Sequence, residues 1–262
     1  MNIGIALGSG GTKGFAHIEY LKVIDEFGIK IGAISGASMG ALIGAFYAGG
    51  MKAAEMEKIF ADLTLFDKAK MADVLSIDKA GLVKGRKIEQ FLEEKLPVKR
   101  FEGLTIPLKI VATDYWSKEQ VIFDKGDIVP AIRASISVPG LFRPYEYENR
   151  LLIDGGVVNP VPFDLLTDDC DFIIGVDVSG EKDIKANAVP SPVEVLLGTF
   201  QIMQKVITDQ KEKGRHVMIY CKPRLNGIRA FEFYKYQEVF ATLPDDIAWF
   251  RAELKKHGLG KN

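Results

Sequence analysis

The sequence predicts an α/β protein with a mainly parallel central sheet and helices on both faces. Short apolar segments alternate with longer helical patterns along the chain, which favours parallel strands joined by helical crossovers. Hydrophobic residues make up 47% of the 262 residues, enough for a large core. Two glycine-rich turns near the start each follow a strand and precede a helix. Because 262 residues is a normal length for one α/β domain, residues 1–262 are expected to form a single domain, and no repeat or low-complexity stretch is visible.

Apolar runs bounded by turn residues define the expected strands, and longer amphipathic or small-residue runs define the expected helices. The strands are expected at residues 2–7, 31–35, 108–114, 120–124, 150–154, 172–179 and 216–221. The helices are expected at residues 15–27, 39–48, 53–63, 85–95, 127–135, 162–166, 192–213 and 244–256. A polar segment at 180–192 contains Pro-Ser-Pro and leads into a helix, so it is not taken as a domain boundary.

Charge and cysteine content narrow the range of functions. Lys and Arg number 34 against 35 Asp and Glu, so the net charge of −1 gives no strong attraction to nucleic acid or to an anionic membrane. Cys170 and Cys221 lie far apart beside apolar runs, which indicates buried thiols in a reducing compartment. Neither a signal-peptide pattern nor an apolar run of transmembrane length is visible. We expect a cytoplasmic protein that is at most peripheral at a membrane.

A glycine-rich loop directly follows the first strand. Its glycines are Gly8, Gly10, Gly11 and Gly14. Such a loop presents backbone N–H groups to an anion, either a nucleotide phosphate or the oxyanion of an acyl-transfer intermediate. The Gly-x-Gly-x-x-x-Gly spacing departs from the dinucleotide fingerprint, and Lys13 followed by glycine excludes a P-loop. We interpret the loop as an oxyanion hole whose donors are the amides of Gly10, Gly11 and Thr12.

A serine lies in the second glycine-rich turn. Gly36, Ser38 and Gly40 fit the Gly-x-Ser-x-Gly pattern of a nucleophile elbow, with an apolar strand before it and a small-residue helix after it. So tight a turn requires flanking positions that are nearly free of side chains. It exposes the Ser38 hydroxyl at a helix N-terminus, where the amide of Met39 points toward developing negative charge. Met39 therefore joins the expected oxyanion donors.

Asp154, followed by Gly155 and Gly156, is expected to be the base that a serine nucleophile requires. It ends a strand, and the two glycines let the backbone approach the serine. Asp-Gly is also a common turn dipeptide. Asp114 and Asp177 end other expected strands, where each could be the base but more commonly caps a turn.

Histidine is an alternative base. The chain has three: His17 inside the first helix, His216 at the start of a strand and His257 in a polar tail. The order Ser38, Asp154, His216 matches the order of an α/β-hydrolase triad. However, only one strand and one helix fit before the strand that leads into the serine, whereas an α/β-hydrolase normally places several strands there. A direct Ser–Asp dyad is therefore favoured.

The three glycine motifs, in this order, resemble those of the patatin-like phospholipase family. They are residues 8–14 (GSGGTKG), 36–40 (GASMG) and 154–156 (DGG), and residues 135–144 and 159–162 are similar too. The resemblance spans residues 2–178. The chain resembles the short bacterial members of the family, which are similar to the catalytic domain of neuropathy target esterase. A patatin-like α/β fold is therefore expected.

This resemblance implies a Ser–Asp dyad acting on lipid acyl esters, with Ser38 as nucleophile and Asp154 as proton acceptor. The implied substrates are phospholipids, lysophospholipids or other fatty acyl esters. Ser9 stands where many members have glycine and Lys13 where many have arginine, and neither change removes an amide donor. Because no cluster of His, Cys, Asp or Glu has metal-ligand spacing, no metal or cofactor is expected.

Two other functions fit parts of the sequence. One is a nucleotide-binding α/β protein that uses the loop at 8–14, and the other is a non-catalytic lipid-binding module that retains the fold. The intact Ser38 and Asp154 favour the hydrolase. Two segments offer apolar side chains either to the core or to a lid or transient membrane contact. They are residues 63–83 and the aromatic cluster of Phe231, Phe233, Tyr234, Tyr236 and Phe240.

Overall fold

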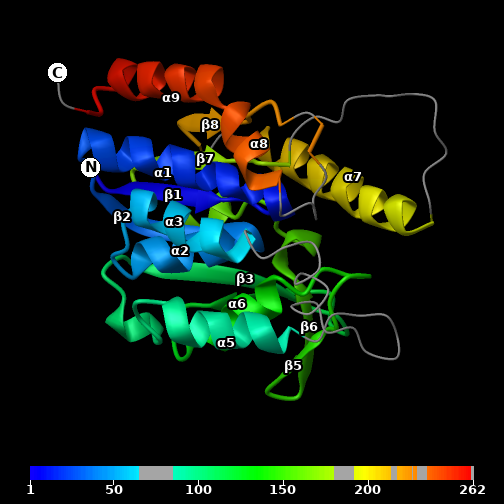
Figure 1. Ribbon diagram of the computed structural model, residues 1–262. Helices are drawn as coiled ribbons and strands as arrows, with labels where there is room; N and C mark the ends of the chain where they lie inside the picture. Colours follow the sequence, from blue (N-terminus) through cyan, green and yellow to red (C-terminus); the bar gives the residue numbers. More distant parts are fainter. Residues whose placement is uncertain (65–84, 180–191, 214–216, 226, 229–234, 261–262) are drawn as a thin grey trace.

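A computed structural model describes residues 1–64, 85–179, 192–213, 217–225, 227–228 and 235–260 (Figure 1). The strands within these ranges are β1 (Ile3–Leu7), β2 (Ile31–Ala37), β3 (Leu108–Asp114), β4 (Gln120–Phe123), β5 (Tyr145–Tyr147), β6 (Arg150–Asp154), β7 (Phe172–Val176) and β8 (Ile219–Cys221). The α-helices are α1 (Ala16–Phe27), α2 (Met39–Ala48), α3 (Ala53–Thr64), α5 (Arg86–Lys95), α6 (Ile128–Ser135), α7 (Pro192–Glu212), α8 (Tyr236–Ala241) and α9 (Pro244–Lys256). Short 3-10 helices are η1 (Gly11–Phe15), η2 (Phe101–Gly103), η3 (Gly155–Val157) and η4 (Phe163–Leu166).

The described strands form one mixed sheet in the order β5-β6-β3-β2-β1-β7-β8, with β4 paired to β3. The pairs β3–β2, β2–β1, β1–β7 and β7–β8 are all parallel. The pairs that involve β4, β5 and β6 are antiparallel. The predicted α/β fold with a mainly parallel sheet is therefore confirmed, with an antiparallel extension on one side.

The register of β3 brings the ends of β2 and β6 together. Val111 pairs with Ala37 of β2 on one edge of β3 and with Ile122 of β4 on the other. Two residues further along, Thr113 pairs with Ile153 of β6 and again with β4. Because β4 occupies one edge at both positions, β2 and β6 share the other. The two strands run in opposite directions there, so their carboxyl ends meet head to head.

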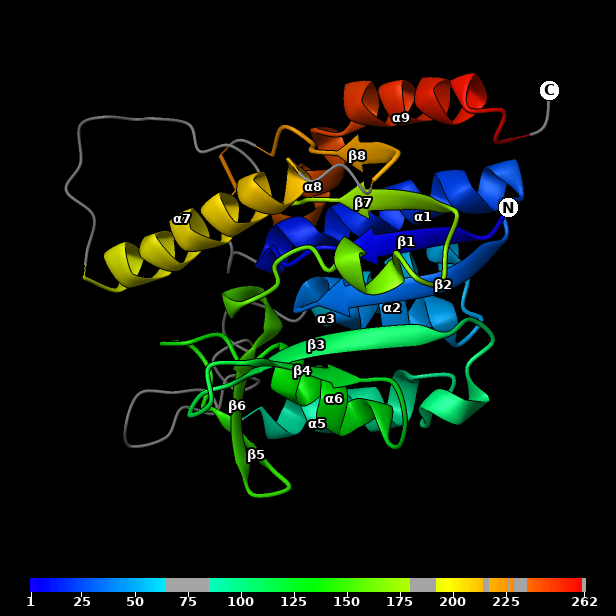
Figure 2. The same cartoon turned by 180° about the vertical axis from the view of Figure 1, so that it is seen from behind.

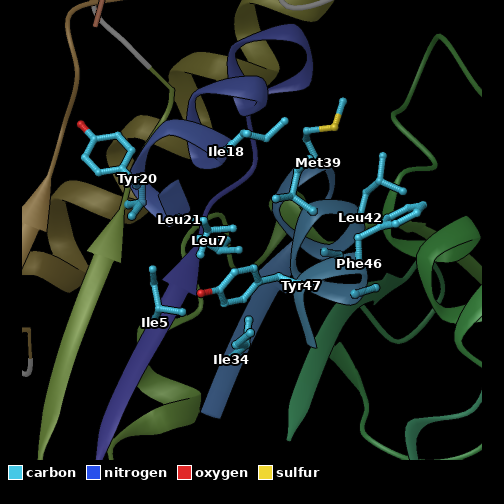
Figure 3. Close-up of a cluster of buried hydrophobic side chains, with 14 of the residues drawn as sticks. Ile5, Leu7, Ile18, Tyr20, Leu21, Ile34, Met39, Leu42, Phe46 and Tyr47 are labelled. Atoms are coloured by element: carbon cyan, nitrogen blue, oxygen red, sulfur yellow. The ribbon is translucent and has the colours of Figure 1, made fainter. Parts of the chain in front are cut away.

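The larger hydrophobic core lies between the sheet and the helices that follow its first two strands. Figure 3 shows buried side chains of β1, β2, α1 and α2 gathered there. Leu7, Ile34 and Phe46 are fully buried, and each such side chain stabilises the fold by roughly 1.5–3 kcal/mol. Every residue of α2 is buried. The helix that begins immediately after Ser38 is therefore held firmly against the sheet.

The opposite face of the sheet carries a smaller core. Val161, Phe163 and Leu166, in and beside η4, pack there with Ala6 and Ile173 of the strands. Seen from behind, the strands lie in front of α1, α2, α3, α5 and α6, so these helices cover the other face (Figure 2). Figure 2 also shows α7 projecting beyond the end of the sheet. Helices thus surround the sheet, but unevenly.

Several predicted boundaries differ from the structure. β7 ends at Val176 instead of residue 179, because the Asp177 side chain accepts the amide of Ser179 and closes a turn. The segment predicted as a helix at 162–166 is the 3-10 helix η4. β8 begins at Ile219, while residue 216 lies outside the described residues. Neither β5 nor α8 is predicted from the sequence, and they are only three and six residues long.

Candidate active site

Ser38 occupies the turn between β2 and α2 in a strained backbone conformation. Its φ of 54° and ψ of −122° lie where few residues other than glycine are found. The neighbouring glycines permit it: a Cβ on Gly36 would lie 2.6 Å from the Gly40 carbonyl oxygen, and a Cβ on Gly40 would lie 2.0 Å from that of Leu7. The Ser38 amide donates to Ser135 Oγ at 2.8 Å. The turn is therefore fixed on both sides.

Asp154 lies directly against this serine. Its Oδ2 accepts a hydrogen bond from Ser38 Oγ at 2.6 Å, and its Oδ1 accepts one from the Gly156 amide at 2.7 Å. The next residue, Gly155, has no room for a side chain, because a Cβ there would lie 2.1 Å from the Val111 carbonyl oxygen. The head-to-head meeting of β2 and β6 thus joins two side chains that are 116 positions apart in the sequence.

Burial determines how this pair is protonated. Asp154 is 0% exposed and Ser38 is 4% exposed. Burial raises the pKa of Asp154 to about 7, because loss of water disfavours the charged carboxylate, while the hydrogen bonds from Ser38 and Gly156 act in the opposite direction. A carboxyl group with a pKa near neutrality is well suited to accept a proton and return it within one reaction cycle.

The glycine loop is anchored to the sheet just before it reaches the serine. The amide of Gly8 donates to the Val176 carbonyl oxygen at 2.9 Å, and the amide of Ser9 donates to that of Pro160 at 2.8 Å. Gly11 then adopts a φ of 56°, the left-handed region that glycine tolerates best. The loop is therefore held in one backbone path.

Three of the predicted oxyanion donors have amides available for a ligand. In the described part of the chain, the amides of Gly10, Gly11 and Met39 donate to no other residue. Met39 is the first residue of α2, where an amide has no partner within the helix. Gly10 and Gly11 line the same cavity as Ser38. Thr12 is buried in η1, and its role as a donor stays a prediction.

His17 supports the glycine loop, a role that the sequence analysis does not assign to it. It is fully buried in α1, and its Nε2 lies 2.8 Å from the Gly8 carbonyl oxygen. Because a carbonyl oxygen only accepts hydrogen bonds, Nε2 carries the proton. Burial lowers the pKa of His17 to about 4, so the imidazole stays neutral at physiological pH. His17 therefore positions the loop from within the core.

Helix α7 covers the site from the side opposite to the sheet. Gln204 Nε2 donates to Ser9 Oγ at 3.0 Å and so joins α7 to the glycine loop. Nearer the start of the helix, Leu197 and Phe200 pack against residues 138–142 in a small cluster separate from the main core. The sequence predicts this helix, but the resemblance weakens there and no motif indicates which of its faces meets the serine.

A cavity of about 20 Å³ remains between α7 and the motif residues. Its lining includes Ser9, Gly10, Gly11 and Ser38 on one side and Leu197, Phe200 and Gln204 on the other. A space of this size holds about one water molecule. The arrangement therefore gives the serine a narrow, partly apolar surrounding.

The other acidic candidates cap turns, which is the role that the sequence left open for them. Asp114 Oδ1 accepts the amides of Trp116 and Ser117, and Asp177 Oδ1 accepts that of Ser179. Neither is recorded in a hydrogen bond with Ser38 in the described part of the chain. Among those residues, no group of three His, Cys, Asp or Glu side chains could hold a metal ion.

The remaining predicted features lie away from the serine or outside the described residues. His216, residues 65–84 and the aromatic residues 231–234 are outside them. His257 packs against Phe172, and Tyr236 and Phe240 pack with the main core. Cys170 and Cys221 are both free thiols, but only Cys221 is fully buried, so the expectation of two buried thiols is half right.

Together the fold and this geometry define a class: α/β proteins in which a serine at a strand–helix elbow is hydrogen-bonded directly to a carboxylate beneath a glycine loop. Residues 5–167 match the sequence profile of one protein family, which is described as patatin-like phospholipase. The chain belongs to the patatin-like phospholipase family, a family of lipid hydrolases.

Similar proteins include members from bacteria and eukaryotes. An uncharacterized NTE family protein of Mycobacterium tuberculosis is 36% identical over 181 residues, which are 69% of this chain and 50% of that protein. A neuropathy target esterase of Drosophila melanogaster is 31% identical over 272 residues, covering 91% of this chain and 19% of the fly protein. A lysophospholipase of Candida glabrata is 24% identical over 285 residues, which cover 98% of this chain and 16% of the yeast protein. The chain thus spans about half of the mycobacterial relative and a smaller part of the other two.

One solved structure agrees with the fold. VipD from Legionella pneumophila superposes with a TM-score of 0.53 at 13% identity, covering 95% of this chain and 67% of that one. This similarity extends the shared architecture beyond residue 167, to the part of the chain that contains α7. No helix in the described ranges combines the length and the hydropathy that crossing a membrane requires.

Proposed function

We propose that this chain is a serine hydrolase of lipid carboxylic esters, of the phospholipase A or lysophospholipase type. The observation that carries the proposal is the 2.6 Å hydrogen bond from Ser38 Oγ to the buried Asp154 carboxylate. Membership of the patatin-like phospholipase family and similarity to a lysophospholipase support a fatty acyl ester as the substrate.

The reaction begins with the transfer of the Ser38 hydroxyl proton to Asp154 Oδ2. Ser38 Oγ attacks the acyl carbonyl carbon, and the oxyanion that forms accepts hydrogen bonds from the amides of Gly10, Gly11 and Met39. When the tetrahedral intermediate collapses, Asp154 returns the proton to the departing alcohol. A water molecule then gives a proton to Asp154 and attacks the acyl carbonyl carbon. As the fatty acid is released, Asp154 passes that proton to Ser38 Oγ, which restores the starting state. A base with a pKa of about 7 serves both steps.

The test combines substrate turnover with labelling of the nucleophile. A short soluble ester such as p-nitrophenyl butyrate, lysophosphatidylcholine and phosphatidylcholine are assayed with the wild type and with Ser38→Ala. We expect Ser38→Ala to lose on the order of 10⁴-fold in turnover or more. Ser117→Ala, at an exposed turn, is the control and should retain full activity on the soluble ester.

A fluorophosphonate should modify Ser38, and mass spectrometry locates the adduct. An adduct on another serine, or a Ser38→Ala variant that still turns over ester, contradicts the proposal. A protein that cleaves no ester but gains thermal stability with nucleotides would instead identify the loop at 8–14 as a nucleotide site.

A further inference from the structure

Helix α7 exposes a row of large apolar side chains to solvent. We call it the apolar stripe, and it consists of Val195, Leu196, Ile202, Met203 and Val206, each 50–62% exposed. With 3.6 residues per turn, these positions fall within one face of the helix. Single exposed apolar residues are common on protein surfaces, but a continuous row of this kind marks an interaction surface.

The face of α7 opposite the stripe is the one that covers Ser38. Leu197, Phe200 and Gln204 on that face line the cavity over the serine. The cavity of about 20 Å³ has room for roughly one water molecule and cannot admit a fatty acyl chain. On the proposed function, α7 must therefore shift before any ester reaches the nucleophile, and for a short soluble ester this shift occurs without a lipid surface. A surface that binds the outer face of α7 is placed to favour that shift.

The charges on this part of α7 favour a lipid surface as the occupant. Between residues 195 and 206 the only charged side chain is Lys205, which forms an ion pair with Asp209 one turn further along α7. This part of the helix therefore has no unpaired acidic group that phosphate headgroups would repel. Helix α7 does not meet the requirements for a membrane-spanning helix, so it would lie along the surface. The stripe thus presents apolar side chains beside an electrically neutral flank, which suits apolar contact with a lipid surface.

A second exposed apolar element lies at the same end of the molecule. The turn between β3 and β4 projects in the same direction as α7 in both views (Figures 1 and 2). It carries Tyr115 and Trp116, which are 50% and 73% exposed. Tyrosine and tryptophan are enriched where proteins meet the lipid–water interface. The turn therefore extends the same docking side.

We propose that the apolar stripe of α7 docks on a phospholipid surface and that this contact displaces α7 from Ser38. The inference rests on the proposed lipid hydrolase function, since it gives the substrate a route to the nucleophile. It also assigns membrane contact to α7, in place of residues 63–83 or the late aromatic cluster that the sequence suggests.

Binding is measured separately from catalysis by placing every variant in a Ser38→Ala background, which leaves the lipid intact. Flotation with phosphatidylcholine vesicles, with and without phosphatidylglycerol, measures the bound fraction. Met203→Ser should weaken binding about fivefold, and the triple variant of Ile202, Met203 and Val206 to serine should abolish it. Met218→Ser is the matched control, because Met218 precedes the edge strand β8, outside α7, and is 55% exposed while Met203 is 53% exposed. It should bind like the parent.

Activity is measured in parallel in proteins that retain Ser38. Met203→Ser should reduce turnover of phosphatidylcholine in vesicles at least severalfold while leaving turnover of p-nitrophenyl butyrate unchanged. Circular dichroism checks the fold of each variant, and the single Met203→Ser variant suffices if the triple variant does not fold.

Several outcomes would overturn the inference. The first is a parent protein that does not bind vesicles, and the second is an equal loss of binding for Met203→Ser and Met218→Ser. The third is a stripe variant that converts a dimer to a monomer in sedimentation, because the stripe would then be an interface between two copies. None of these affects the proposed function, because hydrolysis of the soluble ester and fluorophosphonate labelling test it independently.

Discussion

The two sides of the candidate active site differ in how tightly they are packed. The motif side, formed by residues 8–14, 36–40 and 154–156, leaves no space for an added methyl group at Gly36, Gly40 or Gly155. Among the described residues, the α7 side meets these motifs through one hydrogen bond from Gln204 and a small apolar cluster, with its outer face in solvent. Near its end, Lys211 also joins α7 to Asn159 and Asp164 outside the motifs. Close backbone packing fixes the position of Ser38 and Asp154, whereas α7 is the element that we propose to regulate access. Substitutions on the two sides should therefore have very different effects.

The largest effect in this comparison is expected for Asp154→Asn. The amide cannot accept the serine proton, so turnover of a soluble ester should fall on the order of 10⁴-fold while the fold is retained. Asp114→Asn is the matched control, because Asp114 also ends a strand but caps a turn, and it should change turnover less than about threefold. Equal losses in the two variants would mean that the acidic residues act through folding, not through proton transfer.

Gly11→Ala is expected to have the next largest effect. It should lower turnover by roughly a hundred- to a thousand-fold with little change in KM, because a displaced oxyanion donor matters mainly in the transition state. Gly126→Ala is the control: both glycines have positive φ, at 56° and 82°, but Gly126 lies in a remote open turn. Both variants should lose about 1 kcal/mol of stability, and only Gly11→Ala should lose activity. An unchanged turnover number would show that the loop does not bind the oxyanion.

The rate should depend on pH through Asp154, whose pKa is about 7. Only the ionised carboxylate accepts a proton, so kcat/KM should fall about tenfold per pH unit below 7, reaching about a hundredfold at pH 5, and level off above 7. A profile that is flat from pH 5 to 8 would contradict the role of Asp154 as base.

Stability must be followed in the same pH range, because two buried groups act on it in opposite directions. The raised pKa of Asp154 destabilises the fold as pH rises from about 4 to 7, since the folded state then has to bury a charge. The lowered pKa of His17 destabilises it as pH falls from 6.5 toward 4, since the folded state resists protonation. Circular dichroism at each pH separates these effects from the change in rate.

The smallest effect is expected on the α7 side. Gln204→Ala removes the hydrogen bond to Ser9, which typically contributes 0.5–1.5 kcal/mol, so turnover of a soluble ester should change less than about tenfold. The measurement is kcat on the soluble ester for Gln204→Ala and the wild type. Ser9 is kept unchanged, so that only the Gln204 side of the hydrogen bond is removed. A loss of a hundredfold or more would make Gln204 part of the machinery that holds the reacting groups and would remove the contrast between the two sides.

The sequence predicts the motif side well because its geometry is local. A strand followed by Gly36, Ser38 and Gly40 favours a tight elbow, and in the structure a side chain at either glycine would clash. The loop at Gly8–Gly14 follows the same logic. Pairing Asp154 with Ser38 is different, because the meeting of β2 and β6 depends on the register of β3, and only the resemblance to a family connects the two motifs.

The α7 side could not be predicted for a physical reason. Gln204 and Ser9 are 195 positions apart, and nothing in the local sequence of α7 indicates which neighbour covers which of its faces. Both faces contain apolar residues, so the usual rule that the apolar face is buried does not choose between them. The contribution of His17 was also hidden, because its partner is a backbone carbonyl group that any residue supplies.

The place of β1 in the sheet has a consequence for biosynthesis. β1 is the first strand of the sequence, yet it lies between β2, which ends at Ala37, and β7, which begins at Phe172. On the ribosome, β1 can pair early with β2, but its other edge stays unpaired until β7 has been made. Pairings between distant segments are slow, and an open strand edge invites association with other chains. The nascent polypeptide thus passes through a long interval with an open strand edge, in which a chaperone should raise the yield of native protein. In refolding of the purified protein, slow dilution should have the same effect.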